Sequence, residues 1–258
     1  MQPNKINWGK LKEPYYLRSK KYEEGTYLEL ERKHKGILEY IDVILSKQDR
    51  NTIDFCDAGC GNGIYLNYLK NKYQSINLYG FDFSEKIIEI AKDNTKIKEI
   101  RVGNLENIQF DDKSFDLILC AQVIEHLLDD KKGISELYRI LKTNGYLIIS
   151  TDNKYNIISI LLDLPLKIFL SPYTLIKKLF KNKKNFPHKS YFMKEFKDLI
   201  KTQNFEIEKF STFRFSMPFP FHKIKFMRNI INIFELFCGK IGIFKNNGDI
   251  IVALCKKI

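Results

Sequence analysis

A glycine-rich segment directly after a short apolar run limits most strongly how this chain can fold. Residues 53–66 read IDFCDAGCGNGIYL. The apolar start predicts a buried strand, the three glycines predict a tight loop, and the apolar residues beyond them predict a helix. Glycines allow a ligand to approach the backbone, and the start of a helix favours an anion. The segment therefore predicts a strand–loop–helix unit with a ligand at its loop.

The spacing of these glycines separates three interpretations. An ordinary tight turn needs no ligand, whereas dinucleotide binding favours the pattern G-x-G-x-x-G. Counted from Gly59, that pattern requires a glycine where this chain has Ile64. The third glycine is Gly63 instead, and Asp57 lies two residues before Gly59. The form D-x-G-x-G-x-G is therefore favoured over the dinucleotide form.

The alternation of strand and helix continues along the chain. Apolar runs predict strands at 53–56, 76–81, 100–102, 115–120, 146–150, 205–211 and 250–255. Helical spacing predicts helices at 37–47 and 192–202 and between the earlier strands, and Ser84 can cap the helix that carries Ile87 and Ile88. Alternating strands and helices form a parallel sheet covered on both faces. The expected fold class is α/β, with a seven-stranded, mostly parallel sheet.

Four segments, each on its expected element, together resemble the class I methyltransferases that depend on S-adenosylmethionine. The glycine loop resembles their motif I. GNLENIQFDDKSFD (103–116), CAQVIEHL (120–127) and RILKTNGYLIIST (139–151) match the family's later segments in order. The resemblance covers residues 36–152 well and 187–258 weakly. It implies a Rossmann-like fold, methyltransferase activity and S-adenosylmethionine as the cofactor.

The resemblance also implies which residues bind this cofactor. Asp82 ends the second strand 19 residues after Gly63, where the family places the acid that binds both ribose hydroxyls. A carboxylate suits that role because it accepts two hydrogen bonds at once. Asn104 stands where the family has an Asp, and its amide oxygen can still accept from the adenine amine, while Leu105 supplies a backbone N–H. The cofactor-binding residues expected are Asp57, Ala58, Gly59, Cys60, Gly61, Gly63, Asp82, Phe83, Asn104, Leu105, Cys120 and Ala121.

Methyl transfer is an in-line displacement that needs positioning and exclusion of water but no nucleophilic side chain. A hydroxyl acceptor gains from a general base, and His126, just past the fourth strand, is the catalytic candidate. Packing against the sheet is the alternative role for His126. His188 is a second candidate for contact with the acceptor. The alternative is that His188 is a solvent-exposed loop residue without such a role. Ubiquinone-pathway O-methyltransferases carry a Glu-x-x-Glu-His metal cluster here, but this chain has Gln122 in place of the first Glu, so no metal is expected.

Charge divides the chain into parts of different character. Residues 1–150 contain 23 basic and 23 acidic side chains, whereas residues 151–258 contain 20 and 8, together with 15 of the 20 phenylalanines. We expect an N-terminal arm with a helix at 1–35 and a cofactor-binding core at 36–152. Residues 153–258 would end the sheet and carry basic, aromatic helical insertions at about 153–190 and 212–247.

The basic insertions leave the acceptor open between several classes. They can form a lid over the active site, with their apolar faces buried. They can attach to an anionic membrane surface to reach a lipid-linked acceptor. They can also bind RNA, although no recognisable RNA-binding module accompanies them. Transfer to oxygen on a small or lipid-linked metabolite is expected, with an RNA methyltransferase or a cofactor-binding relative without catalysis as alternatives.

The remaining composition points to an intracellular compartment. The five cysteines are an odd number without a C-x-x-C pair, so we expect reduced thiols. The first ten residues are polar and show no signal peptide, and the longest apolar stretch, 157–176, is interrupted by Asp163, Pro165, Lys167 and Pro172. The expected location is the cytoplasm, with peripheral attachment at the inner membrane face as an alternative.

Overall fold

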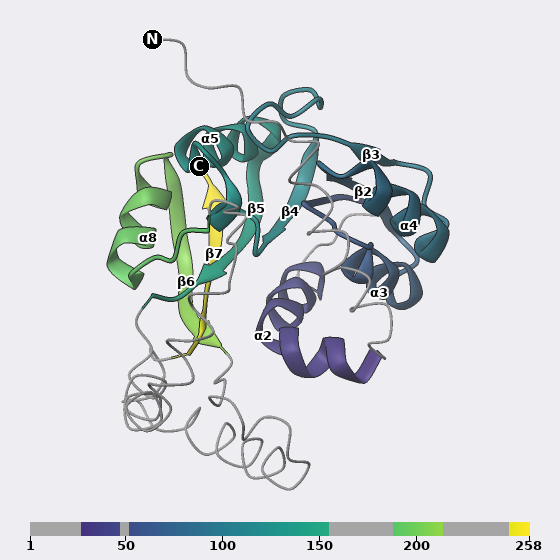
Figure 1. The fold of residues 1–258 in the computed structure, drawn as a ribbon, viewed down its shortest axis with the longest axis horizontal. Helices are drawn as coiled ribbons and strands as arrows, with labels where there is room; N and C mark the ends of the chain where they lie inside the picture. Colours follow the sequence, from purple (N-terminus) through teal and green to yellow (C-terminus); the bar gives the residue numbers. More distant parts are fainter. Residues whose placement is uncertain (1–26, 47–51, 155–187, 214–247) are drawn as a thin grey trace, which may run out of the picture.

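A seven-stranded sheet with helices on both faces forms the centre of the computed structural model (Figure 1). The structure describes residues 27–46, 52–154, 188–213 and 248–258. The strands are β1 (Ile53–Ala58), β2 (Ile76–Asp82), β3 (Ile100–Val102), β4 (Phe115–Ala121), β5 (Leu141–Asp152), β6 (Phe205–Phe213) and β7 (Ile250–Lys257). The helices are α2 (Tyr27–Ser46), α3 (Ile64–Lys72), α4 (Glu85–Thr95), the short 3-10 helix η1 (Ile124–His126), α5 (Asp130–Ile140) and α8 (Met193–Lys201).

The strand order β3-β2-β1-β4-β5-β7-β6 confirms the predicted fold class. Neighbouring strands from β3 to β5 pair in parallel, and β7 runs antiparallel to both β5 and β6. The order reverses between β1 and β4, because the chain builds outward in one direction from β1 to β3 and in the other from β4. Ligands of open α/β sheets bind in the crevice at such a reversal, beyond the carboxyl ends of the strands.

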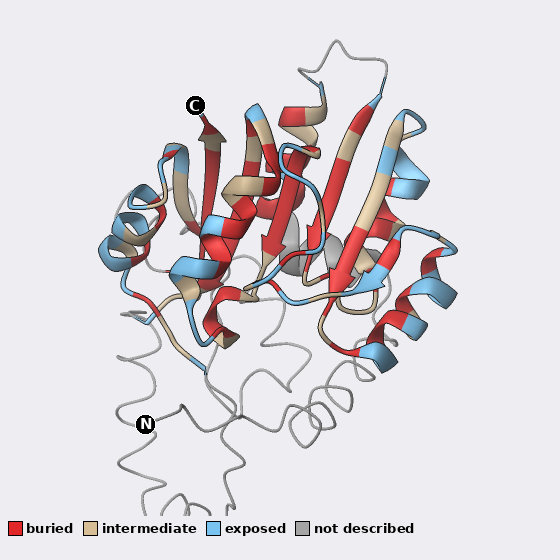
Figure 2. Ribbon diagram, turned by 90° about the horizontal axis from the view of Figure 1, so that it is seen from above, coloured by how far each residue is buried: buried red, intermediate tan, exposed pale blue. Residues whose placement is uncertain are grey.

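Two hydrophobic layers hold the helices against the sheet. On one face, α5 and α8 pack through Ile134, Leu137 and Phe196, all fully buried. On the other face, α2, α3 and α4 pack through residues such as Ile41 and Leu66. Buried residues fill the strands and the inner sides of the helices, whereas the outer sides of the helices are exposed (Figure 2). The sheet is therefore covered on both faces and offers a ligand its carboxyl edge.

Several element boundaries differ from the sequence predictions. The first helix starts at Tyr27, ten residues before the predicted start, and so crosses the expected boundary at residue 36. Ser84 is the N-cap residue of α4, but its side chain makes no capping hydrogen bond. The turn expected at 144–145 is an irregularity within β5, where Leu117 pairs with Tyr146 while Phe115 pairs with Leu141. Asn144 adopts φ 63° there.

The last strand lies inside the sheet, between β5 and β6, and not at its edge. Antiparallel pairing with both neighbours places it there, and local sequence pattern carries no information on that long-range choice. Of the two predicted insertions, residues 155–187 and 214–247 lie outside the described residues, as does most of the N-terminal arm. In the described part, no helix is both long and apolar enough to cross a membrane.

Candidate functional site

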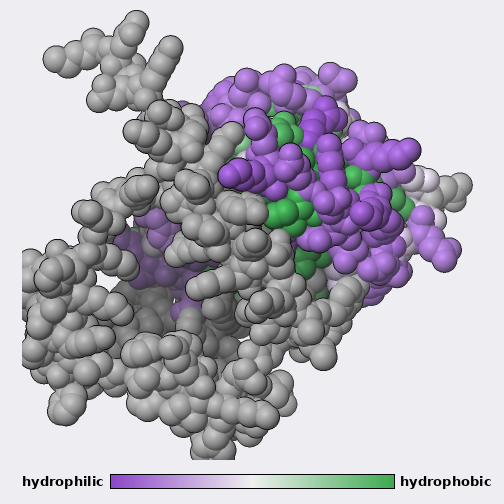
Figure 3. All heavy atoms as spheres, turned by 45° about the vertical axis from the view of Figure 1, so that its right-hand side comes forward, coloured by the Kyte–Doolittle hydropathy of each residue, from purple (hydrophilic) through white to green (hydrophobic). Residues whose placement is uncertain are grey.

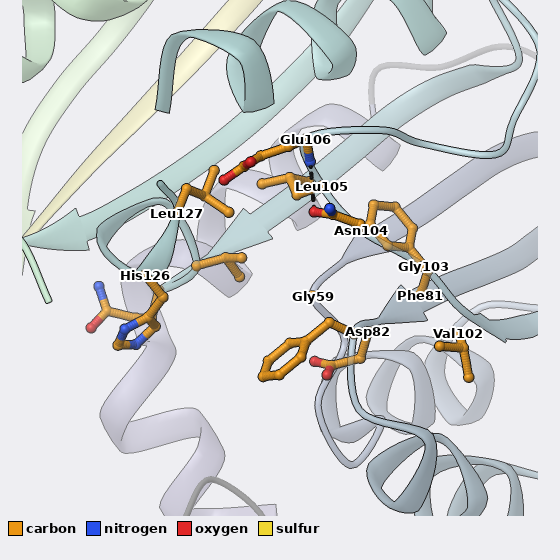
Figure 4. Close-up of a pocket in the computed structure, with 13 residues that line it drawn as sticks. Gly59, Phe81, Asp82, Val102, Gly103, Asn104, Leu105, Glu106, His126 and Leu127 are labelled. Atoms are coloured by element: carbon orange, nitrogen blue, oxygen red, sulfur yellow. Dashed lines mark hydrogen bonds between the residues drawn. The ribbon is translucent and has the colours of Figure 1, made fainter. Parts of the chain in front are cut away.

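A cavity of about 340 Å³ opens at the carboxyl edge of the sheet, at the reversal of strand order. Its wall comes from the ends of four neighbouring strands and the loops that follow them. The lining residues are Gly59, Phe81, Asp82, Phe83, Val102, Gly103, Asn104, Leu105, Glu106, Gln122, Val123, His126 and Leu127. In Figure 4, Gly59 and Asp82 lie between Val102 on one side and His126 with Leu127 on the other. The wall is mostly apolar, with few polar groups, as in sites that bind small molecules.

The glycine loop reaches the cavity in a backbone conformation that side chains disfavour. Gly59, Gly61 and Gly63 have φ values of 84°, 53° and 80°. The N–H groups of Gly59 and Cys60 both donate to the carbonyl oxygen of Phe81, at 2.8 and 2.9 Å, which fixes the loop against β2. A Cβ atom on Gly59 would lie 2.3 Å from Val123, whereas one on Gly61 would meet no atom of the described residues within 4 Å. The loop is therefore tightly held at Gly59 and open at Gly61.

Asp82 ends β2 with a buried carboxylate that lines the cavity. Its Oδ2 atom accepts from the N–H of Gly61 at 3.2 Å, and its Oδ1 atom accepts from the N–H of Ser84 at 3.1 Å. Burial raises the pKa of Asp82 to about 6, while these backbone donors act in the opposite direction. The backbone of Phe83 is a third donor to this carboxylate, which leaves Asp82 lone-pair capacity to accept from a ligand.

Asp57 lies behind the glycine loop as a second buried carboxyl group. It is 1% exposed, and its Oδ2 atom has no hydrogen-bond partner among the described residues. Burial, and then the negative charge of Asp82, raise the pKa of Asp57 to about 8. A hydrogen-bond donor or a positive charge near the loop would stabilise the ionised forms of these two buried carboxyl groups.

The loop after β3 forms the far wall of the cavity. The side-chain oxygen of Asn104 accepts from the N–H of Glu106 at 3.0 Å, a contact marked in Figure 4. The sequence predicts that this oxygen accepts from the adenine amine. Because it already accepts a hydrogen bond within its own loop, one lone pair is left for a ligand. Leu105 is 4% exposed and lines the wall. The oxygen of Glu106 in turn accepts from the N–H of Leu128 at 2.7 Å, which ties this loop to the segment after η1.

The cavity includes about half of the residues that the sequence predicted for it. Gly59, Asp82, Phe83, Asn104, Leu105 and His126 line it. The other predicted residues, Asp57, Ala58, Cys60, Gly61, Gly63, Cys120 and Ala121, do not line it. Ala58 and Cys120 are fully buried in strands, where their side chains belong to the core between the sheet and α5. Their contribution to ligand binding stays a prediction.

Sequence reasoning missed seven lining residues, namely Phe81, Val102, Gly103, Glu106, Gln122, Val123 and Leu127. Five of them directly adjoin a predicted residue, at the end of a strand or in the segment that follows it. Position within a parallel strand was the available signal, since strand ends meet at one edge. Gln122 also has φ 58°, and its Nε2 atom is buried without a partner among the described residues. No sequence pattern indicates that conformation.

His126 ends η1 beside a polar group of side chains from three separate parts of the chain. The ring centroid of His188 lies 5.1 Å from that of His126, and His188 Nε2 lies 3.1 Å from Asp152 Oδ2. Glu125 is buried and accepts a hydrogen bond from Thr151 at 3.0 Å. Its pKa is raised to about 8, mainly by burial. Within the described ranges, no group of three His, Cys, Asp or Glu side chains is arranged to hold a metal ion.

The four free cysteines in the described part, Cys56, Cys60, Cys120 and Cys255, are all buried. Burial raises the pKa of each thiol, which disfavours the reactive thiolate.

On the outside, the described surface around β3 and α4 is largely hydrophilic, with apolar residues visible between the polar ones (Figure 3).

Comparison with known proteins agrees with the geometry. Residues 56–149 match a family model described as a methyltransferase domain. An uncharacterized protein of Methanocaldococcus jannaschii is 34% identical over 142 residues, which cover 54% of this chain and 59% of that protein. The ubiquinone biosynthesis O-methyltransferase of Coxiella burnetii is 28% identical over 121 residues, which cover 45% and 50% of the two chains. The chain thus matches only about half the length of these relatives.

A solved structure shows the same fold across most of the chain. The S-adenosylmethionine-dependent methyltransferase of Archaeoglobus fulgidus superposes with a TM-score of 0.58, covering 94% of this chain and 99% of that one, at 16% identity. The matched residues 56–149 contain the glycine loop, Asp82 and the wall of the cavity. This chain therefore carries a methyltransferase domain of the class I, S-adenosylmethionine-dependent family.

Proposed function

We propose that this protein transfers the methyl group of S-adenosylmethionine to an oxygen atom of a small or lipid-linked metabolite. The observation that carries the proposal is the cavity at the reversal of strand order, whose wall contains both the buried carboxylate of Asp82 and the side chain of His126. A carboxylate at the end of β2 suits a ribose, and an imidazole at the end of η1 suits an acceptor that must lose a proton.

The residues around the cavity fit this cofactor in size and polarity. The apolar wall from Val102 to Leu105 suits adenine, and the carboxylate of Asp82, which lines the cavity, suits the ribose hydroxyls. The unpartnered oxygen of Asp57 suits an ammonium group near the glycine loop. A Cβ atom at Gly61 would meet no atom of the described residues within 4 Å, which supports an approach of the cofactor to the glycine loop there. The bound cofactor supplies a methyl group already activated by its sulfonium charge.

The chain itself then positions the acceptor and receives a proton. His126 is the proposed base, because it lines the cavity and a neutral imidazole accepts a proton near neutral pH. The relative from Coxiella burnetii is an O-methyltransferase by name, which supports oxygen as the accepting atom. The predicted basic insertions, which lie outside the described residues, are the proposed contacts for a lipid-linked acceptor or an anionic membrane surface.

A labelling assay separates the acceptor classes. The protein is incubated with methyl-labelled S-adenosylmethionine and a cell extract divided into lipid, small-molecule, RNA and protein fractions, with Asp82→Ala as the control. We expect label in the lipid or small-molecule fraction, and at least tenfold less with the variant, since hydrogen bonds to charged groups contribute about 1.5–3 kcal/mol. Label in RNA alone would contradict the metabolite acceptor. No label in any fraction, despite cofactor binding, would favour a binding protein without catalysis.

A further inference from the structure

The polar group beside His126 is larger than the proposed base alone requires. The planes of the His126 and His188 rings are tilted by only 32°, and their centroids are 5.1 Å apart. Asp152, the last residue of β5, places its Oδ2 atom 3.1 Å from Nε2 of His188. His126 lines the cavity. A carboxylate, an imidazole and a second imidazole therefore lie in sequence from the end of β5 to the cavity wall.

The segment after His188 is held at the edge of the sheet by several hydrogen bonds. The N–H of Lys189 donates to the carbonyl oxygen of Glu125 at 2.9 Å, and the N–H of Tyr191 donates to that of Asp152 at 3.1 Å. The carboxylate of Asp130 accepts from the hydroxyl of Tyr191 at 2.8 Å and from Lys189 Nζ at 3.1 Å. These bonds come from β5, η1 and α5. These bonds fix the backbone next to His188 and so hold its ring in one place.

Among the described residues, Asp152 is the carboxylate that lies within ion-pair distance of one of the two rings. The other titratable groups of the described segments nearby are Glu125, Asp130, Lys154, Lys189 and Tyr191. Asp130 is balanced by Lys189. The pKa of Glu125 is raised to about 8, mainly by burial and also by the negative charge of Asp152, so Glu125 is mostly neutral at pH 7. In the described residues, the basic group that lies near Asp152 Oδ2 is Nε2 of His188, at 3.1 Å, and not a lysine or arginine.

We propose that Asp152 and His188 are positioning residues of the acceptor site, which hold the ring of His126 and stabilise the positive charge that it gains on taking the acceptor proton. This inference rests on the proposed methyl transfer. In that step the acceptor oxygen bonds to the methyl carbon while the carbon–sulfur bond breaks, and the hydroxyl proton passes to His126. A nearby negative charge favours the protonated ring, and a fixed neighbouring group does so without reorganisation.

NMR titration of the histidine rings tests this without an acceptor. The chain has four histidines, so His126→Asn identifies the signal of that ring in protein labelled with 13C-histidine. Asp152→Asn keeps the shape of the side chain and removes its charge, and His188→Phe keeps an aromatic ring and removes the imidazole. We expect each to move the titration midpoint of His126 to lower pH by about 0.5–1 unit. Asp130→Asn is the matched control, because Asp130 anchors the same segment.

The outcomes separate this inference from the proposed function. A His126 midpoint that stays in place in both test variants, or that moves equally in Asp130→Asn, overturns it. Calorimetry with S-adenosylhomocysteine on the same samples reports on the cofactor site, and an absence of binding by the wild-type protein overturns the proposed function instead. With an acceptor fraction from the labelling assay, we expect the acid limb of the pH–rate profile to move to lower pH in Asp152→Asn, with about tenfold lower turnover and unchanged cofactor KM.

Discussion

At the scale of single residues, two buried carboxyl groups set the chemistry of the glycine loop. Asp57 and Asp82 are each almost fully buried, and the pKa of each is raised by burial. Asp82 is held by backbone donors, but one oxygen of Asp57 is left without a described partner. Such groups cost free energy in the empty fold, and they are typical of sites built for a ligand.

This cost predicts a pH dependence of stability in the ligand-free protein. The pKa of Asp57 is about 8 in the fold, against about 4 in an unfolded chain, so the fold binds its proton more tightly. Its contribution to stability is full below pH 4 and is lost as the pH rises through 8. We expect Asp57→Asn to unfold at a higher temperature than the wild-type protein at pH 9, with a smaller difference at pH 5. Thermal unfolding at both pH values measures this, and equal differences would contradict it.

Two glycines of one loop give different predictions, one mainly for stability and the other mainly for cofactor binding. Gly59→Ala combines φ 84° with a Cβ 2.3 Å from Val123, so we expect a loss of stability of about 2–5 kcal/mol from backbone strain and overpacking. The Cβ atom of Gly61→Ala meets no atom of the described part of the chain within 4 Å, and we expect a loss of only about 1–2 kcal/mol. Its methyl group would enter the space proposed for the cofactor, so S-adenosylhomocysteine binding should fall at least tenfold. Denaturant unfolding and calorimetry separate the two effects, and unchanged binding by Gly61→Ala would remove that space from the site.

At the scale of elements, the sequence predicted the strands well and their placement less well. A run such as Phe115–Ala121 is apolar because both faces of a central parallel strand are buried, so its sequence marks the strand. The position of β7 between β5 and β6 depends on pairing between distant segments, which local patterns do not encode. The site likewise has a part that the local sequence predicts and a part that it does not. Asp82 and the glycine loop were readable as a motif, whereas the meeting of His126, His188 and Asp152 comes from the tertiary fold.

The amino edge of the sheet is held by a lysine that joins three strands. Lys142 Nζ lies 2.7 Å from Asp54 in β1 and 2.8 Å from the buried carboxylate of Asp116 in β4. Lys142→Met leaves that carboxylate without its cation, so we expect a loss of about 1–3 kcal/mol in unfolding free energy. Lys72→Met is the control, because its pair with Asp42 is exposed and such pairs contribute at most about 1 kcal/mol. Urea unfolding measures both, and equal losses would contradict a special role for Lys142.

At the scale of the whole molecule, a first half of balanced charge is joined to a basic second half. The excess of 20 basic over 8 acidic side chains falls in residues 151–258, beyond the matched methyltransferase domain. The matched residues 56–149 contain all the residues that line the cavity. The proposed acceptor site combines His126, within the matched residues, with Asp152 and His188, which lie beyond them.

Calorimetric titration with S-adenosylhomocysteine, on the wild-type protein and Asp82→Ala, shows whether this cavity binds the cofactor. We expect binding of one molecule per chain to the wild-type protein, and at least tenfold weaker binding to the variant, because the ribose hydroxyls lose their acceptor. Lys142→Met, at the opposite edge of the sheet, should bind as the wild-type protein does. No heat of binding to a folded wild-type protein, or equal affinity for Asp82→Ala, would contradict the assignment of this cavity to the cofactor.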